Sequence, residues 1–193
     1  MEAVIEPATL YQAALKIFAR YGFRRARVED IAGELGVAVG TLYRYAANKR
    51  DLYEKTVAFG IGRWQQKVVA GLEGIDDVRD KFKTMCLTAY DHLAGDPDLR
   101  AILVDDPSVF PLVPRNVRFP EIDSASMHLI RQILTEGIDK GVFRPVDVNT
   151  TADLLYSIYV MFIIKTYIKS EGRSTRSMFE GGLDLILNGL LAG

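Results

Sequence analysis

The chain has 193 residues, of which 49% are hydrophobic and 25% are charged, and its formal net charge is −1. This composition is ordinary for a soluble globular protein, and the length allows one large domain or two small ones. The single cysteine, Cys86, excludes an internal disulfide and fits a reducing cytosol.

The first predicted helix begins near Pro7, since proline suits a first helical turn, and ends at Gly22. Residues 1–8 carry two glutamates and no basic residue, so we expect no signal peptide and a cytoplasmic location. The apolar residues of this helix recur at helical spacing and should pack across the next two helices. They are Leu10, Ala14, Ile17, Phe18 and Tyr21.

Residues 27–52 predict two short helices joined by a turn, which is a helix-turn-helix candidate. The first helix has a stripe at i, i+3, i+4 and i+7, made of Val28, Ile31, Ala32 and Leu35. Gly36 follows where a left-handed cap is expected. The second helix offers an exposed glycine, hydroxyls and a guanidinium, a face that suits the DNA major groove. These residues are Gly40, Thr41, Tyr43, Arg44 and Tyr45.

This stretch resembles the DNA-binding domain of the TetR family of bacterial transcriptional regulators. Four blocks carry the resemblance: Asp30-Ile31-Ala32, Leu35-Gly36-Val37, Gly40-Thr41-Leu42-Tyr43 and Asn48-Lys49-Arg50-Asp51-Leu52. Three positions depart from the family pattern. Ala38 and Arg27 stand where the family has hydroxyl caps, and Ala46 replaces a common Phe. A lost cap costs about 1 kcal/mol of helix stability, which weakens the motif locally.

The resemblance implies that the N-terminal head binds an operator in double-stranded DNA. The expected DNA-binding residues are Arg27, Val39, Gly40, Thr41, Tyr43, Arg44, Tyr45 and Lys49. Arg44 suits either a guanine edge or a phosphate, and Val39 at best a thymine methyl. Residues 9–50 hold eight lysines and arginines against three acidic residues, a net +5 that leaves −6 for the remainder. This asymmetry favours a nucleic-acid-binding head.

Six further helices are predicted, which gives an all-α fold of about nine helices without strands or internal repeats. Their expected ranges are 49–70, 76 or 77 to 94, 97 to 103 or 104, 122–140, 147 or 149 to 169, and 174–191. Residues 105–120 contain four prolines and predict an apolar loop. The most apolar run, 154–168, is shorter than the ~20 residues that span a bilayer, so no membrane partner is expected.

The expected domains are a helix-turn-helix head at 1–50 and a ligand-binding and dimerisation body at 51–193. The helix at 49–70 connects them, so a shift of this helix would move the head. The resemblance implies a homodimer through the last two helices, with Ile186 and Leu190 at or near the interface. It also implies a small-molecule cavity among the middle helices of the body.

Candidate effector-binding residues are aromatic or methionine side chains with few charges nearby, which favours an apolar, aromatic or lipid-like effector. They are Met85, Tyr90, Phe110, Phe119, Met127, Tyr156, Tyr159 and Phe162. The leading hypothesis is a repressor released from a palindromic operator by this effector. A ligand-independent regulator with a filled body remains an alternative.

The sequence offers little support for catalysis. His92 and His128 are the only histidines, and no Cys/His cluster has metal-ligand spacing. There is no phosphate-binding glycine loop and no Gly-x-Ser-x-Gly motif. We therefore expect no enzyme, metal or cofactor, and an enzyme with an unrecognised site is the remote alternative.

Overall fold

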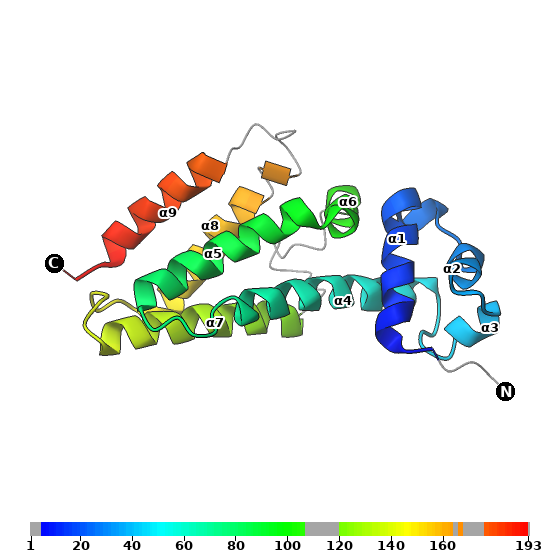
Figure 1. Cartoon of the computed structure of the whole chain (residues 1–193), viewed down its shortest axis with the longest axis horizontal. Helices are drawn as coiled ribbons and strands as arrows, with labels where there is room; N and C mark the ends of the chain where they lie inside the picture. The colour runs from blue at the N-terminus through cyan, green and yellow to red at the C-terminus, as the bar shows by residue number, and fades with distance from the viewer. Residues whose placement is uncertain (1–4, 107–119, 164–165, 168–175, 193) are drawn as a thin grey trace. The chain divides into compact units, whose positions relative to one another are not determined.

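The computed structural model describes residues 5–106, 120–163, 166–167 and 176–192. Over these ranges the chain forms nine helices and no β-strand beyond an isolated bridge between Phe143 and Leu191, which confirms the predicted all-α fold (Figure 1). The described ranges contain no helix that is long and apolar enough to cross a membrane. Phe110 and Phe119, both predicted to bind effector, lie outside the described residues.

The helices follow the predicted order closely. They are α1 (Pro7–Arg25), α2 (Val28–Leu35), α3 (Val39–Leu42), α4 (Lys49–Ala70), α5 (Val78–Gly95), α6 (Pro97–Asp105), α7 (Pro120–Asp139), α8 (Val148–Ile163) and α9 (Arg176–Leu190). The structure differs at α1, which continues for one more turn beyond Gly22. Gly22 itself leaves the helical conformation with φ 70° and ψ 161°, so the predicted stop is present as a kink.

Several predicted caps fix the ends of these helices. Gly36 adopts the left-handed conformation at the end of α2, with φ 66°. Asn48 caps α4, because its Oδ1 accepts the Asp51 N–H at 3.0 Å. Asp77 and Asp147 accept backbone N–H groups at the starts of α5 and α8 in the same way. Sequence therefore located these boundaries through short polar side chains.

The chain divides into two compact units. The first comprises residues 1–64 together with 93–106, and the second comprises 65–92 together with 107–193. The unit that holds the helix-turn-helix thus extends past residue 50, and a functional boundary at residue 50 stays a prediction. Helices α4 and α5 each contribute residues to both units.

The first unit has a core of fully buried aliphatic and aromatic side chains from α1, α2, α3, α4 and α6. They are Leu10, Leu15, Phe18, Ile31, Leu42, Leu52, Leu99 and Ile102. Close packing explains Gly60 on α4, because a Cβ there would lie 3.0 Å from Leu99 Cδ1 and 3.4 Å from Leu15 Cδ1. The predicted packing of α1 on the helix-turn-helix is therefore extended by α6.

The second unit packs α5, α7, α8 and α9 around aromatic rings. Phe82 and Phe143 meet edge to face, with centroids 6.3 Å apart. Gly137 on α7 makes room for this pair, because a Cβ at that position would overlap the Phe143 ring. The turn after α7 is thus pinned to α5 by a ring that needs glycine opposite it.

Candidate nucleic-acid interface

Helices α2 and α3 pack through their apolar faces and leave their polar faces outward. Val28, Ile31, Ala32, Leu42 and Ala46 are buried, while Arg27, Gly40, Tyr43 and Arg44 are exposed. The turn between the helices is closed by the Val37 N–H, which donates to the Ala32 carbonyl at 3.0 Å. Helix α3 ends at Leu42, so Tyr43, Arg44 and Tyr45, which were predicted to lie on the second helix, follow it in a turn.

Arg27 and Ala38 stand at the N-caps of α2 and α3, where hydroxyl caps were predicted to be missing. No side chain caps α3 at Ala38. At α2, the Asp30 carboxylate accepts the Arg27 N–H at 3.3 Å, which stabilises the first turn from within the helix. The Arg27 side chain is therefore not needed as a cap and is exposed at the start of α2.

Tyr45 fastens the segment that precedes α1. Its hydroxyl donates to the Ile5 carbonyl at 2.7 Å and accepts the Ile5 N–H at 3.0 Å. Sequence reasoning gave Tyr45 a DNA-backbone role and missed this contact, because the partners are 40 residues apart. The DNA-binding role of Tyr45 stays a prediction beside this structural one.

Lys49 is held at the start of α4 by contacts with the end of α1. Its Nζ donates to the Arg24 carbonyl at 3.2 Å and lies 4.9 Å from the centre of the Phe23 ring. The Arg50 guanidinium is 5.9 Å from the same ring. Phe23 thus positions two cations, a role that its place after Tyr21-Gly22 did not reveal.

Comparison with known proteins decides the assignment of this unit. Residues 10–56 match the sequence profile described as "Bacterial regulatory proteins, tetR family". The chain carries the DNA-binding domain of the TetR family. The predicted resemblance is confirmed, and the chain is a DNA-binding transcriptional regulator.

The whole chain is similar to regulators of this fold. It is 22% identical to the fatty acid metabolism regulator protein of Bacillus subtilis (strain 168), over 94% of this chain and 93% of that protein. It is 23% identical to the transcriptional repressor KstR2 of Rhodococcus jostii (strain RHA1), over 94% and 89%. The crystal structure of FadR from Bacillus subtilis in complex with stearoyl-CoA superposes with a TM-score of 0.78 at 21% identity, covering 96% of this chain and 100% of that chain.

The predicted effector residues that the structure describes all lie in the second unit. Met85, Tyr90 and Met127 are buried, while Tyr156, Tyr159 and Phe162 are partly buried. Three of them surround Phe179 of α9, which was not among the predicted effector residues. The Phe179 ring stacks on Tyr90 at 4.5 Å and 13°, and meets Phe162 at 5.6 Å and Tyr159 at 6.4 Å.

This aromatic cluster also contains Tyr167, whose hydroxyl donates to the Tyr90 carbonyl at 3.1 Å. Burial raises the pKa of Tyr159 well above its ordinary value, and the nearby Cys86 adds to this shift. Burial also raises the pKa of Cys86 to about 12. Both groups are neutral at physiological pH, so neither adds a charge to this cluster.

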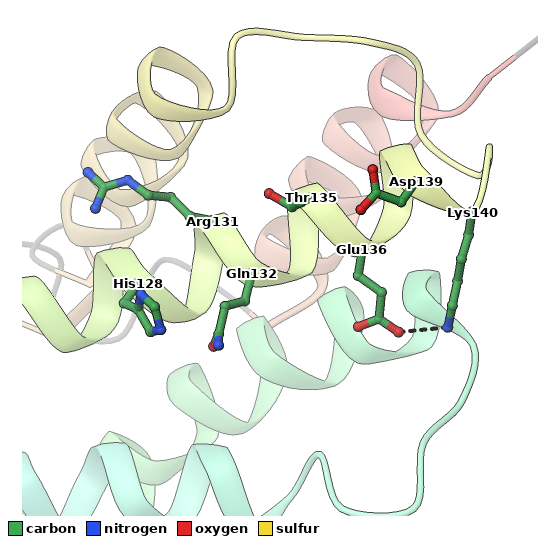
Figure 2. A pocket seen from close by; sticks show the side chains of 7 residues that line it. All are labelled: His128, Arg131, Gln132, Thr135, Glu136, Asp139 and Lys140. Atoms are coloured by element: carbon green, nitrogen blue, oxygen red, sulfur yellow. Dashed lines mark hydrogen bonds and ion pairs between the residues drawn. The ribbon is translucent and has the colours of Figure 1, made fainter.

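A hollow on the surface of the second unit has a different character. It is an open depression of about 540 Å³, lined by polar side chains of α7 and the residue after it: His128, Arg131, Gln132, Thr135, Glu136, Asp139 and Lys140. Figure 2 shows Arg131, Thr135 and Asp139 on one side of the helix and His128, Gln132 and Glu136 on another. A hollow lined by one helix has no opposing wall, so it does not suit an apolar effector.

One carboxylate of this hollow, Glu136, is already paired with two lysines. Glu136 accepts from Lys140 at 2.7 Å and from Lys81 of α5 at 2.9 Å. Hydrogen bonds from Lys140 and then Lys81 lower the pKa of Glu136. Among the described residues, no group of three or more His, Cys, Asp or Glu side chains could hold a metal ion.

Proposed function

We propose that this protein is a cytoplasmic homodimeric repressor that leaves a palindromic operator when an apolar ligand binds its second unit. The observation that carries the proposal is the match to the TetR-family helix-turn-helix, in which Arg27, Tyr43 and Arg44 are exposed. Exposed cations neutralise phosphates, and Arg44 reads a base edge or a phosphate.

Dimerisation is proposed through an apolar stripe on the outer faces of α8 and α9. Leu154 and Met161 on α8 are 59% and 55% exposed, and Met178 and Leu185 on α9 are 44% and 76% exposed. Each pair is seven residues apart and so lies on one face of its helix. A second copy would bury this stripe symmetrically, which places two heads on one duplex.

The exposed stripe identifies residues for testing the interface that differ from Ile186 and Leu190, which the sequence indicated. Leu190, which the sequence placed at or near the interface, is only 5% exposed within its own chain, and Ile186 is partly buried. Leu187 is also buried in the single chain, because α9 turns this side toward its own core. The outward apolar residues of α9 are Met178 and Leu185. A substitution at Leu190 would therefore report on folding of the chain before it reports on dimerisation.

The proposed effector carries a long apolar portion, such as a fatty acyl chain. The aromatic residues around Phe179 support this class, because their rings offer a large apolar contact surface. The FadR of Bacillus subtilis whose structure superposes was crystallised with stearoyl-CoA, which makes that compound a reasonable probe.

Release from DNA follows if the effector and the operator prefer different conformations. Two heads bind half-sites about 34–36 Å apart, so their spacing sets operator affinity. A ligand that prefers a body with another head spacing weakens DNA binding, and DNA weakens ligand binding by the same factor. The effect requires differential affinity for the two conformations and not tight binding alone.

One observation favours the alternative of a regulator that needs no ligand. The Tyr90 and Phe179 rings stack at 4.5 Å, so these two side chains already fill the space that they share. A ligand must displace this stack or bind beside it. In the alternative, the aromatic cluster serves only as the core of the second unit.

The test combines operator selection with an effector titration. The wild-type protein selects duplexes from a random pool, and its affinity for the recovered sequence is measured by fluorescence anisotropy. We expect a palindrome, and we expect stearoyl-CoA to weaken its binding. A compound that binds stoichiometrically without shifting operator affinity would support the ligand-independent alternative, and recovery of no preferred duplex would contradict repressor function.

A further inference from the structure

Helix α6 belongs to the compact unit of the DNA-binding head, although it lies about 40 residues beyond the stretch that matches the family profile. Leu99, Ile102 and Leu103 of α6 are each 2% exposed or less. Leu99 contacts the glycine face of α4, where a Cβ on Gly60 would lie 3.0 Å from Leu99 Cδ1. The head is therefore completed by α6, which follows residues 65–92 of the second unit in the sequence.

An ion pair between a buried carboxylate and a partly exposed guanidinium holds the start of this helix. Asp96 is 8% exposed, and its Oδ1 accepts the Leu99 N–H at 3.0 Å as the N-cap of α6. Its other oxygen, Oδ2, accepts from Nη2 of Arg63 on α4. Nη1 of the same guanidinium donates to Oε1 of Gln12 on α1. One side chain of α4 thus joins α1 and α6.

The C-terminal end of α6 is held to the same unit by separate contacts. The Tyr53 hydroxyl of α4 donates to Oδ2 of Asp106 at 3.2 Å. Gly22 of α1 faces the carboxylate of Asp105, where an added Cβ would lie 2.8 Å from Oδ2. Contacts at both ends therefore hold α6 in one position on the head.

The ion pair also lies close to the two points at which the chain passes between the units. The chain leaves the first unit after Trp64 and returns to it at Leu93. Arg63 and Asp96 stand next to these two crossings. A displacement of α4 or α5 would reach the first unit close to this pair, and separating it would leave the buried Asp96 carboxylate without its guanidinium partner.

We propose that Gln12, Arg63 and Asp96 form a latch that makes the seating of α6 and the geometry of the DNA-binding head interdependent. When the latch holds, α1, α4 and α6 move as one body. When it opens, α6 loosens from α1, and the helix-turn-helix that packs on α1 loses its fixed orientation. The measurement of operator affinity rests on the proposed function, whereas the position of α6 on the head is tested by hydrogen exchange in the free protein.

The experiment compares Asp96→Asn with Asp91→Asn. The amide introduced by Asp96→Asn keeps a carbonyl oxygen to cap Leu99 but removes the charge that holds Arg63. Asp91 pairs with Arg176 at 2.8 Å in the second unit, so the control makes the same substitution and the same charge change at an exposed pair. Gln12→Ala is the milder variant, since it opens only the arm to α1.

Hydrogen exchange of residues 97–105 and operator affinity are measured for each protein. In Asp96→Asn we expect exchange of α6 to accelerate about tenfold or more, with weaker operator binding and unchanged exchange in α8. Gln12→Ala should shift both quantities in the same direction by less, and Asp91→Asn should shift neither.

Three results would overturn the latch. They are unchanged α6 exchange in Asp96→Asn, acceleration spread evenly over the whole chain, and faster α6 exchange with unaltered operator affinity. If the wild-type protein binds no duplex, the proposed function fails. The exchange comparison in the free protein still decides whether the latch seats α6.

Discussion

The two compact units differ in what holds their functional side chains. In the first unit, polar and cationic side chains are tied to backbone atoms, as Lys49 is to Arg24 and Tyr45 to Ile5. In the second unit, rings pack on rings around Phe179. The first arrangement fixes a surface in one shape, which suits a ligand as regular as a DNA duplex. In the second arrangement, the packing of the rings would determine which of the proposed ligands fits.

The largest expected effect comes from breaking the apolar stripe of the second unit. Met161→Glu with Leu185→Glu places two charges where a second copy would bury them, which is costly without partners. We expect monomers by light scattering and a loss of operator affinity of about a hundredfold or more, because two linked heads bind far better than one. Val69→Glu, at an exposed apolar residue of α4, is the matched control and should remain dimeric. A dimeric double variant would place the interface elsewhere.

Adding a methyl group inside the second unit tests whether the stability of that unit is independent of the stability of the head. Gly137→Ala forces a methyl group into the Phe143 ring and should lower the free energy of unfolding of the second unit by about 1–3 kcal/mol. Gly62→Ala on α4 is the control, since no neighbouring atom lies within 4 Å of its Cβ position and it lies outside the proposed interface. Hydrogen exchange at increasing urea concentration, read separately at α7 and at α1, distinguishes the units. Equal stability of α7 in both variants would show that the Phe143 contact does not constrain α7.

Substitutions in the head separate base reading from phosphate contact. Arg44→Ala should cost about 1–3 kcal/mol of binding free energy for the selected operator if Arg44 reads a base, and little of that difference for scrambled DNA. Lys49→Ala should weaken binding to both duplexes and reduce the salt slope by about one. Salt titrations of both variants on both duplexes provide the measurement. A sequence-selective loss in Lys49→Ala would reverse these roles.

The smallest expected effect is a pH dependence at the start of α4. A hydrogen bond from the Ala47 N–H, followed by one from Lys55, lowers the pKa of the Asp51 carboxyl. A lowered pKa means that the contribution to stability is present above the unfolded value near 3.8 and is lost as the pH falls through the folded pKa. Asp51→Asn should therefore flatten the acid side of the stability profile, measured by urea denaturation between about pH 5 and 2. An unchanged profile would show that Asp51 gains nothing from these bonds.

The contrast between the units also explains which features the sequence predicts. Helix boundaries follow from local residues such as Gly36, Asn48 and Asp77, so they could be placed without knowledge of the fold. Long-range ties could not. Tyr45 meets Ile5 across 40 residues and Arg63 meets Asp96 across 33, and no spacing rule indicates such pairs.

The orientation of α9 shows the same limit within one element. Its apolar residues were placed correctly on a helix, but Leu185 faces outward while Leu190 is buried. Periodicity predicts that a stripe exists and does not tell a core-facing stripe from one that faces a second chain. Phe179 likewise appeared as one apolar residue among several, whereas it lies at the centre of the aromatic cluster.

The most direct test of the account is the ratio of affinities for the selected palindrome and for a scrambled duplex of equal length and composition. The measurement is made with the wild-type protein at ~0.15 M salt, where phosphate contacts alone give weak binding. A regulator that reads sequence through α3 should prefer the palindrome by about a thousandfold or more. Equal affinity for the two duplexes would contradict sequence-specific operator binding.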